Sequence, residues 1–231
     1  MKKKILSLVL VFALALALGI GGTVAWLTAK TEEVVNTFTV GDIKIKLEEH
    51  KLNEDGKTLG SEVTQTNKYN RVVPGSKYAK DPYVTITEGS ENCWVFIKVT
   101  EAGGAVTVKE NGADVDKTFD DFLDYDISSV WTAVPVPGHA GYYYYKDGDT
   151  TVAPVGKPIY ILAGEGNDAL KNGFVSVLNT VTKEMSNALT ENNLPTLSFI
   201  AAAVQSENVA TVTDAWNALP KEFTGTEPTN P

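Results

Sequence analysis

Cys93-Trp-Val-Phe-Ile-Lys-Val-Thr100 is a strongly β-prone run near the middle of this chain of 231 residues. Apolar side chains occupy consecutive positions, which predicts a central strand buried on both of its faces. Trp94 and Phe96 would lie on one face, opposite Val95, Ile97 and Val99. Cys93 is the single cysteine of the chain and no His or Arg flanks it, so we expect a buried, unreactive thiol.

Further strand patterns lie on both sides of this run. Residues 42–48 alternate, with Ile43, Ile45 and Leu47 on one face and charged residues on the other. Residues 83–87 form another strand pattern, and the turn-like residues 88–92 predict that it pairs antiparallel with 93–100. Short β runs follow at 106–109, 142–146, 159–162 and 196–205, the last of them apolar on both faces.

Two segments near the C-terminus predict helices. Residues 174–189 fit a strand to about Thr180 and then a short helix from Thr182 or Lys183 to Leu189. A second short helix is expected from Thr213 as N-cap, with Val212, Trp216 and Leu219 on one stripe and Pro220 at its end. Residues 224–231 are polar and rich in proline, which is typical of a disordered tail.

These patterns predict an all-β fold, an antiparallel jelly-roll-like β-sandwich with one or two short peripheral helices. A hydrophobic content of 43% can supply a real core. The expected organisation is a signal peptide at 1–25, an N-terminal arm at 26–40, a β-sandwich domain at 41–223 and a disordered tail at 224–231.

The N-terminal arm is separated by a break in apolar phase at Gly41. Val34, Phe38 and Val40 occupy even positions, whereas the apolar residues from Ile43 onward occupy odd positions. One continuous strand cannot present both sets to the same face. The segment 26–40 is therefore a separate unit, either an ordinary strand after a corner or an arm that packs on another subunit through Val34, Phe38 and Val40.

The first 25 residues have the pattern of a secretion signal. Three lysines at positions 2–4 precede an apolar run of 16 residues, shorter than the roughly 20 that a membrane-spanning helix needs. Thr23 and Ala25 stand at −3 and −1 of a cut that would leave Trp26 first. The mature chain is then expected outside the cell, without a membrane anchor, at a formal charge of −12 instead of −9. That acidity argues against nucleic acid as a partner.

Several stretches resemble one family. Gly21-Gly-Thr-Val-Ala-Trp-Leu-Thr-Ala29 and Asn36-Thr-Phe-Thr-Val-Gly-Asp-Ile-Lys-Ile45 are similar to the start of TasA- and camelysin-like exported proteins of Gram-positive bacteria. Val73-Pro-Gly-Ser-Lys-Tyr-Ala-Lys-Asp-Pro-Tyr83, Cys93-Trp-Val-Phe-Ile-Lys-Val99 and Leu197-Ser-Phe-Ile-Ala-Ala-Ala-Val-Gln205 extend the likeness, with Ala215-Trp216 shortly after. Residues 102–160 show no such resemblance.

The resemblance implies processing by a SipW-type signal peptidase and a jelly-roll matrix protein. It further implies self-assembly into an extracellular, biofilm-matrix-type fibre, in which each subunit donates its N-terminal segment to the next. The alternative is a secreted or surface-associated β-sandwich that binds a ligand or adheres. A third hypothesis is a metallopeptidase, because camelysin-like proteins are classed as such.

The residues themselves do not favour an enzyme. Metallopeptidase motifs place two histidines one helical turn apart around a glutamate. This chain has only His50 and His139, which are 89 residues apart, and it has no nucleophile elbow or phosphate-binding loop. We therefore expect no catalytic residues, no metal and no cofactor.

Two other features were weighed for binding. Acidic pairs occur at 114–116, 120–121, 124–126 and 147–149, and the last of them encloses a glycine as calcium loops do. None completes an EF-hand, so solvated loops are the preferred interpretation. Residues 142–145 are four tyrosines, which suit either a sugar-stacking face or a half-buried strand with two tyrosines on each side. We prefer the half-buried strand, since tyrosine favours strands.

Overall fold

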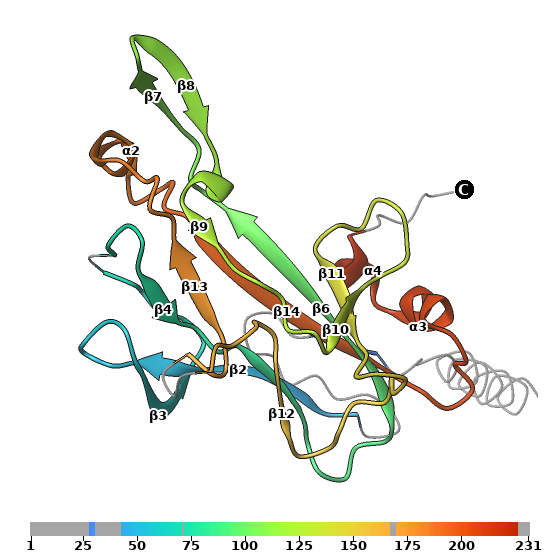
Figure 1. Ribbon diagram of the computed structural model, residues 1–231. Helices are drawn as coiled ribbons and strands as arrows, with labels where there is room; N and C mark the ends of the chain where they lie inside the picture. Colours follow the sequence, from blue (N-terminus) through green and yellow to red (C-terminus); the bar gives the residue numbers. More distant parts are fainter. Residues whose placement is uncertain (1–27, 31–42, 71, 167–169, 226–231) are drawn as a thin grey trace, which may run out of the picture.

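The computed structural model describes residues 28–30, 43–70, 72–166 and 170–225. They form an all-β, sandwich-like arrangement of antiparallel sheets with a few short helices (Figure 1). No helix within these ranges has both the length and the apolar character needed to cross a bilayer.

The largest sheet contains five strands in the order β1-β14-β6-β11-β10. These are β1 (Thr28–Lys30), β14 (Thr196–Gln205), β6 (Cys93–Ala102), β11 (Tyr142–Tyr145) and β10 (Trp131–Ala133). β6 and β14 pair over ten positions, from Cys93 opposite Gln205 to Ala102 opposite Thr196. The predicted central position of the 93–100 run is confirmed, because β6 has a neighbour on each side.

A second sheet packs against the first in the order β12-β5-β2-β3. Its strands are β12 (Pro158–Tyr160), β5 (Tyr83–Ile86), β2 (Ile45–Leu52) and β3 (Leu59–Thr64). The pairing of β2 with β3 shifts register between His50 and Leu52. Two steps along β2 correspond there to four along β3, from Val63 to Leu59, so the extra residues lie in β3.

Smaller elements extend the two sheets. β4 (Lys77–Ala79), β13 (Phe174–Val177) and β9 (Leu123–Asp124) form a short three-stranded sheet. β7 (Val106–Glu110) and β8 (Ala113–Lys117) form a hairpin that projects away from the body of the molecule (Figure 1).

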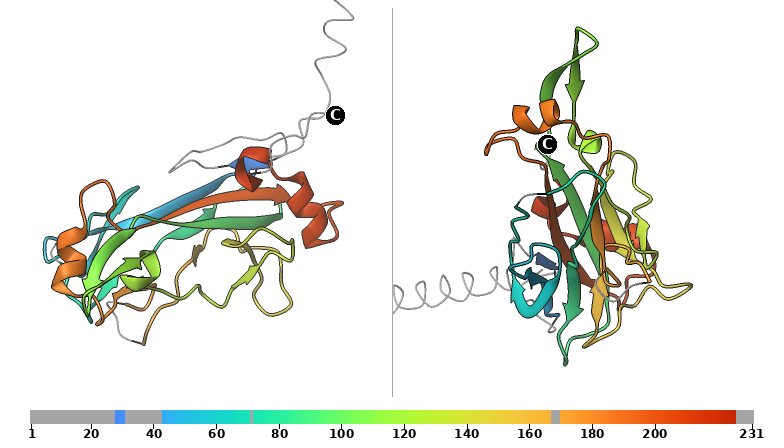
Figure 2. Two further views of the ribbon diagram at one scale, coloured as in Figure 1. Left: turned by 90° about the horizontal axis from the view of Figure 1, so that it is seen from above. Right: turned by 60° about the vertical axis from the view of Figure 1, so that its left-hand side comes forward.

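Four short helices complete the described part of the chain. They are the 3-10 turn η1 (Phe119–Asp121) and the helices α2 (Lys183–Ala188), α3 (Val212–Ala218) and α4 (Lys221–Thr224). α2 lies at the base of the projecting hairpin, where Met185 packs with Val108 and Phe122. α3 and α4 lie beside the five-stranded sheet at the opposite end of the molecule (Figures 1 and 2).

Both faces of the five-stranded sheet are buried. Odd-numbered residues of β6, such as Val95 and Ile97, join the core between the two large sheets. Even-numbered residues, Trp94 and Phe96, face the other way and pack under Trp216 of α3 and Phe223 of α4. The two helices thus cover a surface that a two-layer sandwich alone would leave in water.

The expected pairing of 83–87 with 93–100 is wrong. β5 lies between β12 and β2 in one sheet, whereas β6 lies between β14 and β11 in the other. The turn residues between them therefore cross from sheet to sheet. Both strands are apolar on both faces, and such strands give no sequence signal for which of them become neighbours.

Other expectations are confirmed in detail. Ile43, Ile45 and Leu47 are all buried, and the C-terminal strand occupies 196–205 as expected. The segment 174–189 divides into β13 and α2, with Thr182 as the N-cap of the helix.

The ends of the C-terminal helices differ from the expectation. The N-cap of α3 is Thr211, two residues before the expected Thr213, and its hydroxyl accepts a hydrogen bond from the backbone N–H of Asp214 at 3.1 Å. Thr224, expected in the tail, is the buried last residue of α4.

Candidate functional site

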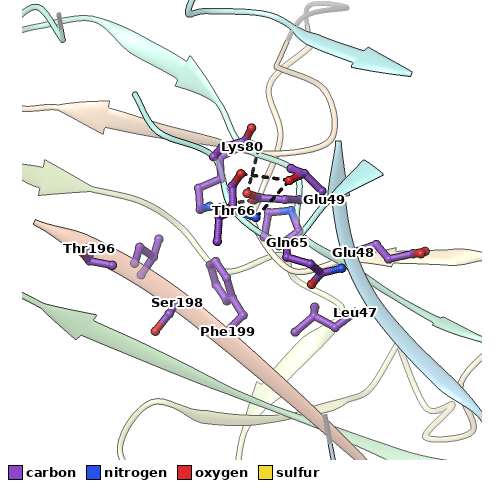
Figure 3. Close-up of a pocket in the computed structure, with 13 residues that line it drawn as sticks. Leu47, Glu48, Glu49, Gln65, Thr66, Lys80, Thr196, Ser198 and Phe199 are labelled. Atoms are coloured by element: carbon purple, nitrogen blue, oxygen red, sulfur yellow. Dashed lines mark hydrogen bonds and ion pairs between the residues drawn. The ribbon is translucent and has the colours of Figure 1, made fainter. Parts of the chain in front are cut away.

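A groove of about 130 Å³ lies between β2, the residues after β3 and the first half of β14 (Figure 3). Leu47 and Glu49 come from β2, and Phe199 extends from β14 into the space between the two strands. The other lining residues are Glu48, Thr64, Gln65, Thr66, Asn67, Lys80, Pro82, Thr196, Leu197 and Ser198. The two walls of the groove are thus β2 from the second sheet and β14 from the five-stranded sheet, and the groove lies along the side of the sandwich.

Among the described residues, the β14 wall of this groove is an open strand edge. β6 pairs with all ten residues of β14 on one side, and on the other side β1, among the described strands, pairs only with Ala202–Val204. Thr196–Ile200 therefore border the groove without a described neighbouring strand. Open edges of this kind present N–H and C=O groups that can bind another strand.

The hydrogen bonds of β6 show which way the N–H and C=O groups of β14 point. The N–H of Val99 donates to the C=O of Gly141, on the β11 side. In an antiparallel pair, residues opposite each other point their N–H and C=O groups either both toward or both away from the partner. Phe199 lies opposite Val99, so its N–H and C=O point away from β6 and toward the groove, as do those of Leu197 two residues earlier.

A buried ion pair lies on the opposite wall. Nζ of Lys80 is 2.8 Å from Oε2 of Glu49, and both side chains are about one-tenth exposed. Asn67 donates from Nδ2 to Oε1 of the same Glu49 at 2.9 Å. Asn67 also donates to the C=O of His50 and accepts from the N–H of Leu52, each at 2.8 Å. It thereby satisfies backbone groups of β2 at the point where the pairing with β3 is irregular.

A second acidic side chain, Asp81, lies beside this pair and is only 2% exposed. Its carboxylate accepts from the backbone N–H of His50 at 3.0 Å and lies 2.7 Å from His50 Nδ1. Burial, followed by the charges of Glu49 and Asp81, raises the pKa of Tyr69 well above its ordinary range. Burial and the charges of Glu48 and Asp81 raise the pKa of Tyr83 to about 12. The neutral phenol forms of both tyrosines are therefore the ones that suit this site.

The two histidines do not form a common site. His50 lies on β2 beside Asp81, whereas His139 lies in the β10–β11 hairpin loop and packs 4.8 Å from the ring of Trp216. Within the described ranges, no group of three or more His, Cys, Asp or Glu side chains is arranged to hold a metal ion.

The acidic segments lie on loops and on the projecting hairpin. Asp114 pairs with Lys109 across the hairpin at 2.7 Å, and Asp116 accepts a hydrogen bond from the hydroxyl of Thr107. Asp121 accepts from the backbone N–H of Thr118 at 2.8 Å, within the cap of η1. These carboxylates take part in local hydrogen bonds and ion pairs at the surface.

The tyrosine strand is buried. Tyr142 and Tyr144 pack in the outer cluster beneath α3 and α4, and Tyr143 and Tyr145 pack toward the core between the sheets. Two tyrosines therefore lie on each face, which confirms the interpretation as a half-buried strand. Cys93 is also buried, and burial raises its thiol pKa to about 12.

The expected processing and assembly residues lie outside the described residues. Thr23, Ala25 and Trp26, at the expected cleavage site, precede the first described residue, Thr28. Val34, Phe38 and Val40 fall in the range 31–42, which is also not described. Of the expected arm, only Thr28–Lys30 is described, and it forms β1 on the edge of β14 in the same chain.

Sequence reasoning did not identify the groove or its buried charges. Lys80, Asp81 and Glu49 come from short segments in which a charged residue is normally exposed. The only available signal was the apolar environment of each: Glu49 follows the alternating 43–47 strand, and Lys80-Asp81 precedes Pro82-Tyr83-Val84. Comparison with models of protein families, with curated proteins and with solved structures gave no match to this chain. The resemblance to TasA- and camelysin-like proteins therefore rests on the quoted sequence stretches alone.

Proposed function

We propose that this protein is a secreted structural subunit of an extracellular, biofilm-matrix-type fibre, and that its copies assemble by exchange of the N-terminal strand. The observation that carries this proposal is the open edge of β14 at Thr196–Ile200, which borders a groove. Two N–H and two C=O groups, from Leu197 and Phe199, point toward that groove and are available to an added strand.

The N-terminal arm has the chemistry of such a strand. Val34, Phe38 and Val40 share one face of a β-prone segment, so they would enter the groove together while the backbone pairs with β14. Burial of three such side chains contributes on the order of 5–8 kcal/mol before the cost of association. That is enough to favour a polymer at modest protein concentration.

The position of β1 makes exchange between copies geometrically simple. Thr28–Lys30 already pairs antiparallel with Val204–Ala202 of its own chain, immediately beside the open part of the edge. In the fibre, the arm of one copy would take the equivalent place on the next copy and continue along it. Each subunit would then give one strand and receive one, which generates an open, head-to-tail filament.

Export and processing fit the same scheme. A SipW-type signal peptidase would cut after Ala25 and free the arm only outside the cell, so assembly would begin at the cell surface or in the matrix. The partners are then a second copy of this chain and the processing peptidase. Sequencing of the secreted protein from its N-terminus should start at Trp26.

The proposal is tested by deletion of residues 26–36 from the mature protein. Negative-stain microscopy and a sizing column should show filaments for the intact mature form and only folded, β-rich monomer for the deletion variant. A variant that lacks residues 226–231 serves as a control for truncation at the other end of the chain, and it should still form filaments. Normal polymerisation without the arm would overturn the exchange mechanism, and a persistent monomer of the intact mature form would favour a binding or adhesion module instead.

A further inference from the structure

On the groove wall, a lysine and an asparagine both bind the carboxyl group of one glutamate. Nζ of Lys80 binds Oε2 of Glu49 at 2.8 Å, and Nδ2 of Asn67 binds Oε1 of Glu49 at 2.9 Å. An amine and a carboxamide are thus held on the two oxygens of the same side chain (Figure 3 shows Lys80 and Glu49). The irregular pairing of β2 with β3 accounts for the bonds of Asn67 to the backbone of β2, but it does not require a buried lysine and glutamate beside them.

The amine of Lys80 lies among aromatic rings with little exposure to solvent. Its Nζ lies 5.6 Å from the ring centre of Phe199 and 6.0 Å from that of Tyr69, and the side chain is 11% exposed. Transfer of one proton across the 2.8 Å contact converts the ammonium and carboxylate into an amine and a carboxylic acid. After that transfer, the site presents a nucleophilic amine beside a proton donor.

The hydrogen bonds of the Asn67 carboxamide suit addition of an amine to its Cγ. Its Oδ1 accepts the backbone N–H of Leu52 at 2.8 Å, and negative charge would develop on this oxygen as a nucleophile adds to Cγ. Its Nδ2 faces Oε1 of Glu49, which can protonate the departing nitrogen. Three groups fixed in one buried site gain the large effective concentration that intramolecular reactions show.

We propose that Lys80 and Asn67 form an intramolecular isopeptide bond, with Glu49 as the acid–base group. Nζ of Lys80 leaves Oε2 and adds to Cγ of Asn67, and the N–H of Leu52 stabilises the charge on Oδ1. Glu49 accepts a proton from Nζ and gives one to Nδ2. The Cγ–Nδ2 bond then breaks and ammonia departs, leaving an amide between the two side chains.

The reaction is balanced without any other reactant. One C–N bond forms and one breaks, and no group is oxidised or reduced. The ammonium and carboxylate of the starting pair become an amide, a carboxylic acid and ammonia, with all five nitrogen-bound protons of Lys80 and Asn67 retained among the products. The cross-link would join the segment after β3 to the segment after β4, and it does not depend on fibre formation.

The test is the intact mass of the secreted, purified protein, measured under denaturing conditions. The wild-type mass should fall below the mass of the processed sequence by one ammonia, and tryptic peptides containing Asn67 and Lys80 should be recovered joined, without cleavage after Lys80. A wild-type mass equal to that of the sequence would overturn the proposal outright.

Matched variants separate this bond from other losses of ammonia. Asn111 and Asn172 each precede glycine and can lose ammonia by succinimide formation, which would persist in Lys80→Arg and Glu49→Gln proteins. The isopeptide bond should be absent from both variants. Asn67→Asp should lose water in place of ammonia and give a cross-linked product of wild-type mass. Persistence of the ammonia loss in Lys80→Arg would assign it to another site and contradict the proposal.

Discussion

Ile97 and Lys98 are neighbours on β6 whose side chains lie on opposite faces of the sheet. Ile97 is fully buried between the two large sheets. Lys98 lies on the outer face, where its Nζ is 5.0 Å from the ring centre of Tyr142 and the side chain is partly exposed. Substitution by an acidic residue at these two positions therefore compares the cost in stability of a charge inside the sandwich with its cost on the outer face.

Ile97→Asp should prevent folding, because it buries a carboxylate with no partner in the core. Lys98→Glu loses only a partly exposed cation–π contact and should lower the free energy of unfolding by about 1 kcal/mol. Urea denaturation followed by tryptophan fluorescence measures both effects. Equal loss of stability in the two variants would contradict the assignment of the two faces.

Ionisation of Tyr83 should lower the stability of the folded protein at alkaline pH. Its pKa in the folded protein is about 12, above the ordinary value of 10.0 for tyrosine, so folding favours the neutral phenol. The stabilisation is fully present below pH 10 and is lost as the pH rises toward 12. Tyr83→Phe retains the ring contacts with His50 and Tyr160 and should make the fall in melting temperature over this pH range shallower. An unchanged pH profile would show that Tyr83 ionises as freely when folded as when unfolded.

For single residues, the sequence predicted burial correctly where it depends on apolar neighbours close by in the chain. The burial of Cys93 and the two-sided packing of Tyr142–Tyr145 both follow from local strand patterns. Glu49 and Lys80 could not be predicted, because each charge becomes tolerable only when the other arrives from a distant segment of the chain.

Helices α3 and α4 act as a cover for the outer face of the five-stranded sheet. Trp216 packs 6.0 Å from Phe96, and Phe223 lies 5.7 Å from Tyr142, measured between ring centres. The hydroxyl of Tyr142 also donates to the C=O of Phe223 at 3.0 Å. A four-residue helix has little stability of its own, so α4 depends on this packing.

A chain that ends at Pro220 should therefore be much less stable than one that ends at Gly225. The shorter form lacks Phe223, whose loss from a buried site costs about 3–5 kcal/mol and about 10 °C in melting temperature for a domain of this size. The longer form retains α4 and its left-handed C-cap at Gly225, and it should melt like the full-length mature protein. Thermal denaturation of the two truncated forms makes the comparison; equal melting temperatures would mean that α4 contributes nothing to the fold.

Elements with strong local patterns were predictable, and their neighbours were not. β14 and α2 occupy the expected positions because their periodicity and capping are local properties. β3 was not predicted, since its residues are mostly polar and it forms by pairing with β2. The mistaken pairing of β5 with β6 has the same origin: adjacency along the chain does not decide which sheet a doubly buried strand joins.

At the scale of the molecule, the described residues bury both faces of the five-stranded sheet and leave part of one of its edges without a neighbouring strand. β6 and β14 form its centre by pairing over ten residues, and β1 covers only three positions on the far side of β14. This edge was not predictable from the sequence of β14, which reads as an interior strand. It results from the topology, in which no other described strand reaches Thr196–Ile200.

Two proline variants test whether this edge receives a strand in the fibre. Proline at a strand edge is tolerated where the missing N–H faces outward, whereas it breaks a ladder hydrogen bond where the N–H faces the neighbouring strand. The N–H of Leu197 points away from β6, and that of Ser198 points toward it. Leu197→Pro should therefore leave the monomer folded, with its melting temperature within a few degrees of the parent.

Filament formation separates the two roles of β14. Leu197→Pro removes a donor from the open edge and places a rigid ring in the groove, so the variant should fail to form filaments by negative-stain microscopy although it remains a folded monomer. Ser198→Pro instead disrupts the pairing with β6 and should lower the free energy of unfolding by about 3 kcal/mol or more. Filaments of normal length from a folded Leu197→Pro protein would show that the added strand does not bind at this edge, and the acceptor site would have to be sought elsewhere on the sandwich.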